Sequence, residues 1–250
     1  MQRYFLQEDD FEDKLIRISG EDYHHITRVM RMEPGDQMIC VINNQQTALC
    51  EITEIANDTV VGTVIEWKNE TQELPVKVTI VSGLPKGDKL EYIIRKGTEL
   101  GAAEFIPFIA ARSVVKWDQK KAAKKQERLQ KIAKEAAEQS HRTVMPAVLE
   151  PKTMDELLLY SDAYDYKLIA FEEEAKRGET GVLASVLRGI KPGQSLLFLF
   201  GPEGGLAQNE IDRLIRAGFM ACGLGPRILR TETAPLYTLS AVSYQLELLR

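Results

Sequence analysis

The sequence of 250 residues contains few cysteines and no long apolar run. Cys40, Cys50 and Cys222 are an odd number and form no CxxC pair, which argues against a disulfide framework and against a zinc or other metal site. Apolar runs such as residues 196–200 are far shorter than the ~20 residues that cross a bilayer. No apolar stretch follows the charged N-terminus, so we expect no export signal, no membrane partner and a reducing, cytoplasmic setting.

Two phosphate-binding motifs are also missing. The chain has no G-x-x-x-x-G-K-[ST] segment and no G-x-G-x-x-G segment after a strand. A nucleotide hydrolase or a Rossmann dehydrogenase would therefore lack its usual phosphate contacts. If the protein uses a cofactor, one without phosphates suits the sequence better.

Acidic residues outnumber basic ones, but the net charge is distributed unevenly along the chain. The net charge of −5 argues, taken alone, against a nucleic-acid partner. Residues 1–70 hold 6 Lys/Arg against 14 Asp/Glu, a net charge of −8, whereas residues 71–250 hold 26 against 23, a net charge of +3. Within the second part, residues 112–142 carry ten basic and four acidic side chains. A polyanion can therefore bind locally.

The chain divides into two predicted domains. Residues 1–72 read as a small β-barrel or sandwich, in which turn residues separate short alternating strands such as 37–41, 47–55 and 59–66. A short helix is expected over 22–32, and a polar linker over 68–73. The boundary near residue 72 leaves residues 73–250 for the second domain.

Residues 73–250 alternate between strand and helix patterns, which favours a parallel α/β domain. The last helix has Pro235 in its first turn and places Leu236, Leu239, Val242, Leu246 and Leu249 on one face. The expected strands are 76–81, 105–109, 167–171, 196–200 and 219–224, and the expected helices before the last are 89–100, 118–139, 182–188 and 209–217.

Two loops that each follow a strand are the best candidates for a site. Open α/β sheets bind ligands at the carboxyl ends of their strands. The first loop, residues 201–205, is Gly-Pro-Glu-Gly-Gly, where three glycines allow close approach of a ligand and positive φ angles. The second, residues 224–234, places two arginines, a glutamate and two threonines between a strand and a helix. A lone Gly-rich loop is equally well explained as a tight turn.

Taken together, these two loops resemble the cofactor loops of the ribosomal RNA small-subunit uridine N3-methyltransferases, a family of the trefoil-knotted SPOUT class. Other segments, in the right order along essentially the whole chain, resemble further motifs of that family: Arg3-Tyr4-Phe5, His24-His25-Ile26 through Arg31, Gly35-Asp36, Lys96-Gly97-Thr98-Glu99-Leu100-Gly101 and Glu138-Gln139-Ser140-His141-Arg142. One departure is Leu206-Ala207, where the family often has an aromatic residue and then Ser or Thr; this leaves the next helix to be capped by Gln208 or Asn209.

The resemblance implies a fold, a cofactor and a reaction. The fold is a PUA-like β-barrel that binds RNA, followed by an α/β domain with a trefoil knot, one of the rare exceptions to unknotted chains. The cofactor is S-adenosylmethionine, and the assembly is a homodimer through the knotted domains. The reaction is methylation of one uridine N3 of 16S ribosomal RNA in the assembled small subunit.

The resemblance also assigns residues of the two loops. Arg230 is expected to stabilise the negative charge that spreads over the uracil carbonyl oxygens when N3 loses its proton, or else to pair with Glu232 or Glu203. Glu203 is either a base whose pKa burial raises or a loop carboxylate that accepts backbone amides. The residues expected to bind the cofactor are Phe200, Gly201, Pro202, Gly204, Gly205, Leu224, Gly225, Ile228, Leu229 and Thr231.

RNA is expected to contact basic residues of both domains. The helix 118–139 has a buried stripe of Leu129, Ile132, Ala133, Ala136 and Ala137, which leaves its lysines either on a solvated face or on RNA phosphates. His24 and His25 are better explained by an ordinary amphipathic helix with Ile26, Val29 and Met30 in the core. The residues expected to bind RNA are Arg3, Arg28, Arg31, Lys120, Lys121, Lys124, Gln139 and Arg142.

Two other functions stay open at this point. A non-catalytic ribosome-assembly factor would bind RNA and keep the same fold as a scaffold. A related methyltransferase would act on a tRNA or on a ribose 2′-hydroxyl. The cofactor loops favour an enzyme over the scaffold, while the pattern of residues does not identify the target nucleotide.

Overall fold

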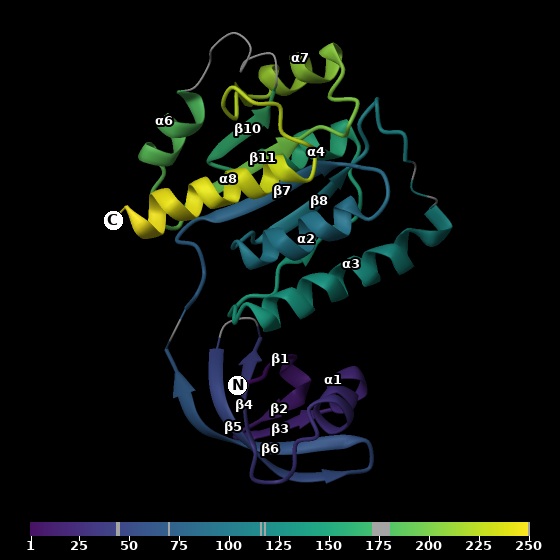
Figure 1. Ribbon diagram of the computed structural model, residues 1–250, viewed down its shortest axis with the longest axis vertical. Helices are drawn as coiled ribbons and strands as arrows, with labels where there is room; N and C mark the ends of the chain where they lie inside the picture. The colour runs from purple at the N-terminus through teal and green to yellow at the C-terminus, as the bar shows by residue number, and fades with distance from the viewer. Residues whose placement is uncertain (44–45, 70, 116, 118, 172–180, 250) are drawn as a thin grey trace. The chain divides into compact units, whose positions relative to one another are not determined.

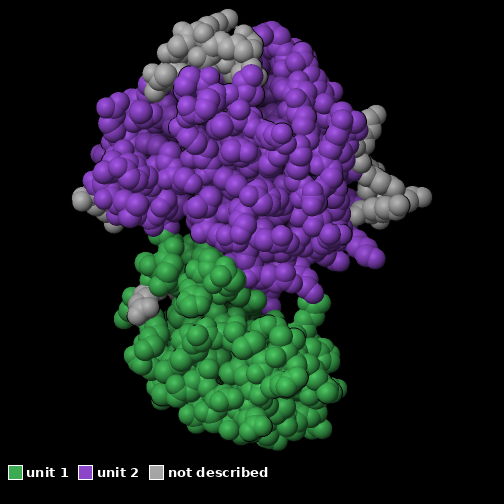
Figure 2. Space-filling view, viewed as in Figure 1, with its two compact units in different colours: residues 1–73, 137–145 green, residues 74–136, 146–250 purple. Residues whose placement is uncertain are grey.

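The computed structural model describes residues 1–43, 46–69, 71–115, 117, 119–171 and 181–249 (Figure 1). The chain forms two compact units, coloured separately in Figure 2. Unit 1 comprises residues 1–73 and 137–145, and unit 2 comprises residues 74–136 and 146–250. Each unit has its own sheet and its own hydrophobic core.

Unit 1 is built on a six-stranded sheet with the order β1-β4-β5-β6-β3-β2. β1 runs parallel to β4, and the other pairs are antiparallel. The predicted strands 37–41, 47–55 and 59–66 are confirmed, each extending one or two residues further. The strands are β1 (Arg3–Leu6), β2 (Phe11–Glu12), β3 (Leu15–Ile18), β4 (Gln37–Ile42), β5 (Gln46–Ala56) and β6 (Thr59–Lys68), with a 3-10 turn at Glu8–Asp10.

The helix predicted over 22–32 is shorter and irregular. α1 (Gly20–His24) continues as a π-helical turn over His25–Val29. Because this wider turn changes the spacing of side chains, Ile26 is buried as expected, whereas Val29 is 66% exposed. The expectation that Val29 and its neighbour Met30 belong to the core was therefore wrong.

The segment 137–145 packs with unit 1. Ala137 and Met145 contact Phe5 and Val41 in a small hydrophobic cluster. The segment also continues α3 (Gln119–Gln139), which begins in unit 2. The compact units thus differ from the predicted domains, 1–72 and 73–250, by Glu73 and residues 137–145, and these domain bounds stay a prediction.

Unit 2 contains a six-stranded parallel sheet with the order β12-β10-β11-β7-β8-β9. The predicted alternation of strands and helices is confirmed. Its strands are β7 (Lys77–Gly83), β8 (Glu104–Phe108), β9 (Ala147–Val148), β10 (Tyr166–Ala170), β11 (Ser195–Phe200) and β12 (Met220–Cys222), and its helices are α2 (Lys89–Glu99), α3, α4 (Met154–Ser161), α6 (Val182–Gly189), α7 (Gln208–Arg216) and α8 (Thr233–Ser243).

Helices cover both faces of this sheet because successive side chains of a strand point to opposite sides. In β11, Leu196, Phe198 and Phe200 join the cluster that includes α2, α3, α6 and α8. Leu197 and Leu199 join the opposite cluster with α4 and α7. Figure 1 shows α2 and α8 lying across the front of the strands.

Two helices of unit 2 differ from the prediction. The helix α4 was missed, although Thr153 and Glu156 form a capping box at its start. Neither Gln208 nor Asn209 caps α7; the Glu210 carboxylate accepts the backbone N–H of Ala207 at 2.8 Å instead.

The end of the chain is also irregular. A π-helical turn, Tyr244–Leu248, follows α8 and shifts the predicted apolar face. Leu239 and Val242 are fully buried as expected, but Leu249 is 55% exposed. In the part of the chain that the structure describes, no helix combines the length and apolarity of a membrane span.

Candidate active site

The two predicted loops begin at neighbouring strand ends. β11 and β12 flank β10, and all three run parallel. Loop 201–205 follows β11, and loop 224–231 follows β12. The strand order reverses between β11 and β7. The strands β8 and β9 lie on one side of β7, and the later strands β10, β11 and β12 lie on its other side. Such a reversal at the carboxyl ends of parallel strands is where open α/β sheets bind ligands.

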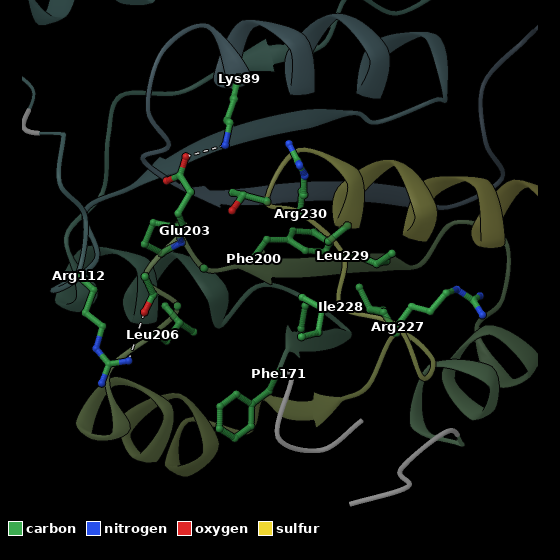
Figure 3. A pocket seen from close by; sticks show the side chains of 18 of the residues that line it. Lys89, Arg112, Phe171, Phe200, Glu203, Leu206, Arg227, Ile228, Leu229 and Arg230 are labelled. Carbon is green, nitrogen blue, oxygen red and sulfur yellow. Dashed lines mark hydrogen bonds and ion pairs between the residues drawn. The ribbon is translucent and has the colours of Figure 1, made fainter. Parts of the chain in front are cut away.

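A cavity of about 660 Å³ opens between these loops (Figure 3). Its volume lies within the ~300–1,000 Å³ typical of small-molecule sites. All the residues expected to bind the cofactor, and both expected catalytic residues, line it. They are Phe200, Gly201, Pro202, Glu203, Gly204, Gly205, Leu224, Gly225, Ile228, Leu229, Arg230 and Thr231. The structure brings these residues together, and their roles remain predictions.

The glycines of the loops are required for different reasons. A Cβ on Gly204 would lie 3.2 Å from the Cβ of Arg112, so this position is crowded by another side chain. Gly225 has open space around it, with the nearest atom at 4.0 Å, but its φ of +89° is strained for any residue with a Cβ. The protein alone therefore requires glycine at Gly225 for its backbone conformation, and its close approach to a cofactor stays a prediction.

Apolar side chains form part of the cavity wall. Phe200 is buried at the end of β11, and Phe171 follows β10. Ile228 lines the same cavity yet is 75% exposed. A large apolar side chain that remains exposed at a cavity is typical of a surface that a ligand covers.

Lys89, at the start of α2, bridges acidic residues from the two loops. Its Nζ lies 2.9 Å from Glu203 Oε1 and 3.4 Å from Glu232 Oε2. Glu203 Oε1 also accepts the backbone N–H of Lys86 at 3.1 Å. Figure 3 shows Lys89 reaching from its helix toward Glu203. One ammonium group therefore connects α2 to both loops.

Glu203 is not a carboxyl group held in its protonated form. Partial burial raises the pKa of Glu203, but the hydrogen bonds from Lys89 and from backbone amides outweigh it and leave this pKa below its ordinary value. The lowered pKa and the bond from Lys86 N–H favour the alternative of a loop carboxylate that accepts a backbone amide over a base whose pKa burial raises, and the catalytic role of Glu203 stays a prediction.

Among the residues that the structure describes, three arginines line the cavity. Arg112 donates to the carbonyl oxygen of Gly204 at 3.2 Å, whereas Arg227 extends away from loop 201–205 (Figure 3). Arg230 is exposed, and none of the described carboxylates lies within 4.0 Å of its guanidinium group. The alternative in which Arg230 pairs with Glu203 or Glu232 is thus not what the structure shows.

The residues predicted to bind RNA are spread over both units. Arg28 and Arg31 are exposed on unit 1, at and just after its π-helical turn. Lys124 and Gln139 are exposed on α3. The side chains of Lys120 and Lys121 lie outside the described part of the structure. The buried stripe predicted for this helix is confirmed.

Arg3 and Arg142 are in the interior of unit 1. Arg142 is 2% exposed, and its guanidinium group binds the carboxylate of Glu73 through Nε and Nη2. Arg3 donates to the backbone oxygen of Arg142 at 2.7 Å. Burial and these partners argue against direct phosphate contacts, and they give both arginines a structural role in unit 1 that the sequence did not reveal.

Sequence reasoning missed several residues at the cavity. Lys89, Arg112 and Phe171 lie 30 or more residues before the second loop and reach the site only through the topology of the sheet. Gly83 supports it indirectly, since a Cβ there would lie 2.5 Å from Pro202. The available signal was position, because Phe171 ends a predicted strand and Gly83 lies two residues beyond the predicted strand 76–81.

Family models match most of the chain. Residues 72–243 match an RNA methyltransferase domain, and residues 18–65 match an RNA methyltransferase PUA domain. The fold is therefore a PUA-like N-terminal domain followed by an α/β methyltransferase domain.

Individual relatives agree with these models. The chain is 54% identical to the ribosomal RNA small subunit methyltransferase E of Bacillus subtilis, over all of this chain and 99% of that protein. It is 32% identical to the protein of the same name from Synechocystis, over 98% of this chain and 78% of the relative. A crystal structure of such an enzyme from Neisseria gonorrhoeae, bound to S-adenosyl methionine, is 28% identical, with a TM-score of 0.84 over 97% of both chains.

Proposed function

Since this chain belongs to the ribosomal RNA small subunit methyltransferase E family, we propose that it transfers a methyl group from S-adenosylmethionine to N3 of one uridine in 16S ribosomal RNA. The observation that carries the proposal is the cavity between loops 201–205 and 224–231, with Arg230 in its wall and no described carboxylate within 4.0 Å of its guanidinium group. The substrate is the small ribosomal subunit, and the cofactor supplies an electrophilic methyl group when bound.

The cavity suits this cofactor. The backbone at Gly204 and Gly225 comes close to the cavity without side chains in between, which favours main-chain contacts to an adenosine. Ile228 and Leu229 offer apolar surface to a base or to a methionine chain. Glu203 and Glu232 are already engaged with Lys89.

Arg230 has the main chemical role. When uridine N3 gives up its proton to a base or to water, negative charge spreads over N3 and the uracil carbonyl oxygens. The N3–CH₃ bond then forms as the bond from the methyl group to sulfur breaks, and this neutralises the charge. A guanidinium group stays charged at every relevant pH and can donate to such an oxygen. Because the charge develops only during the reaction, this contact lowers the barrier more than it strengthens substrate binding.

RNA binding is assigned to exposed basic residues away from the cavity. Arg28 and Arg31 of unit 1 and Lys124 of α3 are free to contact phosphates. Such contacts release counterions and give salt-dependent affinity without reading sequence. We keep Lys120, Lys121 and Gln139 in this set.

A homodimer through the knotted domains is part of the same proposal. Along α8 and the π-helical turn after it, large apolar side chains remain exposed: Tyr237 at 43%, Tyr244 at 56% and Leu248 at 71%. Surfaces of this kind are typical of protein interfaces. Light scattering of the purified protein measures the assembly directly.

The cofactor site is tested with two glycine variants. Gly225 and Gly193 have φ values of +89° and +86°, and neither has a neighbour closer than 4.0 Å. An alanine at either position should therefore cost similar stability, about 1 kcal/mol. Only Gly225 lines the cavity, so Gly225→Ala should weaken S-adenosylmethionine binding in calorimetry while Gly193→Ala should not. Equal affinity in both variants would place the cofactor elsewhere.

The reaction itself is tested by nucleoside mass spectrometry of 16S ribosomal RNA. A strain without this gene should lack one N3-methyluridine, and the purified protein should restore it on isolated small subunits. A missing methyl group on another RNA, or on a ribose, would overturn the proposed target.

A further inference from the structure

Lys89 forms ion pairs with two carboxylates, and one of them is two residues from Arg230. Lys89 is the first residue of α2, more than 100 residues before the loops that it contacts. Its ammonium group binds Glu203 from loop 201–205 and Glu232, which follows Arg230 by two residues. All four charged side chains thus belong to one part of unit 2, with two cations and two carboxylates.

The arrangement of charges within this cluster is uneven. Both carboxylates face Lys89, while no described carboxylate is within 4.0 Å of Arg230. Arg230 is the cation better suited to pairing with a carboxylate, since its planar group donates two parallel hydrogen bonds. Although Glu232 is only two residues from Arg230, the described ion pair of this carboxylate is with Lys89.

We propose that Lys89 is a positioning residue for methyl transfer: by binding Glu203 and Glu232, it keeps both carboxylates away from Arg230, whose guanidinium group then remains available to the uracil. This inference rests on the proposed function. If Lys89 only linked the two loops, the charge of Glu203 and Glu232 would not matter for the rate. In this proposal the effect of Lys89 depends on the negative charge of both carboxylates.

The burial of these groups makes the competition strong enough to matter. The side chains of Lys89, Glu203 and Glu232 are 31%, 32% and 19% exposed, so water screens them only in part. The hydrogen bond to Glu203 raises the pKa of Lys89, and the pKa of Glu203 is lowered, as expected for a pair that holds both charges. Without the ammonium group, Arg230 is a cation of the same cavity wall that these carboxylates can bind.

The test compares three variants. Lys89→Met keeps an unbranched apolar side chain of nearly the same length and removes the charge. The second combines Glu203→Gln with Glu232→Gln, and the third carries all three changes. We expect Lys89→Met to slow single-turnover methylation by about 10- to 100-fold, as for loss of one electrostatic contact in a transition state. Its affinity for S-adenosylmethionine should stay within about twofold of wild type, a difference well under 1 kcal/mol.

Rescue distinguishes the proposal from a structural role. Once both carboxylates are neutral, Arg230 has no competing partner, so the triple variant should methylate about as fast as the double Gln variant. A triple variant as slow as Lys89→Met would overturn the proposal and leave Lys89 as a link between loops. Loss of cofactor binding in Lys89→Met would also overturn it.

A crystal structure of Lys89→Met gives a readout that does not depend on activity. Its Arg230 guanidinium should lie within about 4 Å of Glu203 or Glu232, the usual limit for an ion pair. An Arg230 that stays unpaired would contradict the inference. Normal methylation by Arg230→Ala would instead contradict the proposed role of Arg230 in the reaction. The crystal structure of Lys89→Met would still show whether Lys89 keeps the two carboxylates away from Arg230.

Discussion

Replacing Arg142 with methionine should destabilise unit 1 by about 3 kcal/mol, because it breaks a buried ion pair from one side. Arg142 and Glu73 have side chains that are 3% and 19% exposed. In the variant, the carboxylate of Glu73 still accepts the backbone N–H groups of Thr143 at 2.9 Å and Val144 at 3.1 Å, and water reaches it in part. The cost should therefore lie at the lower end of the ~3–5 kcal/mol that one-sided removal of a buried pair produces.

The reverse change should cost more. Glu73→Ala leaves the buried guanidinium group without this carboxylate and removes the acceptor of two backbone N–H groups. We expect about 5 kcal/mol, the upper end of the same range. An exposed arginine of the same unit, Arg17, is the matched control, and Arg17→Met should change stability by less than about 0.5 kcal/mol.

Tryptophan fluorescence can follow unit 1 by itself. The chain has two tryptophans, Trp67 on β6 and Trp117 in unit 2. In a Trp117→Phe background, urea unfolding followed at Trp67 measures the free energy of unfolding of unit 1. If Arg142→Met and Glu73→Ala both matched the Arg17→Met control, the ion pair would have no structural role, and Arg142 would return to the set of RNA contacts.

Two further predictions concern the site and RNA binding. Because the pKa of Glu203 lies below its ordinary value, this carboxylate is ionised at neutral pH and loses its stabilising pair with Lys89 only as the pH falls through that lowered pKa. The pH–rate profile of Glu203→Gln between pH 6 and 9 should therefore keep the shape of the wild-type profile. Loss of the acidic limb of this profile in the variant would make Glu203 the base. Arg28→Ala combined with Arg31→Ala should weaken binding of a 16S fragment and reduce the slope of log K against log salt by about 1 per lost phosphate contact. Arg17→Ala is the control for the second test, and an unchanged slope would mean that the π-helical turn does not contact RNA.

Much of the site could be predicted from the sequence because its main residues lie in two short loops. Glycines and polar residues directly after a strand indicate where a parallel sheet binds a ligand, and both loops line the same cavity. Glu203 was placed correctly, but its protonation depends on Lys89, which comes from the start of α2. Nothing local to either segment predicts that their side chains meet.

Local irregularity and long-range pairing explain the remaining differences. The π-helical turns at His25–Val29 and Tyr244–Leu248 alter the spacing on which the expected burial of Val29 and Leu249 depended. Arg142 was expected to bind RNA as a site residue at the end of the helix 118–139. Its burial follows from a partner 69 residues away, which periodicity does not report.

The central claim is that Arg230 acts on the reaction and not on cofactor binding, and single-turnover methylation of small subunits tests it most directly. Arg230→Ala should lower the rate by ~100-fold or more, and Arg230→Lys by less, because the guanidinium contact forms only as N3 loses its proton. Calorimetry should give near wild-type S-adenosylmethionine affinity for both variants. A normal rate in Arg230→Ala would remove Arg230 from the mechanism, and loss of cofactor binding would reduce it to a structural support of loop 224–231.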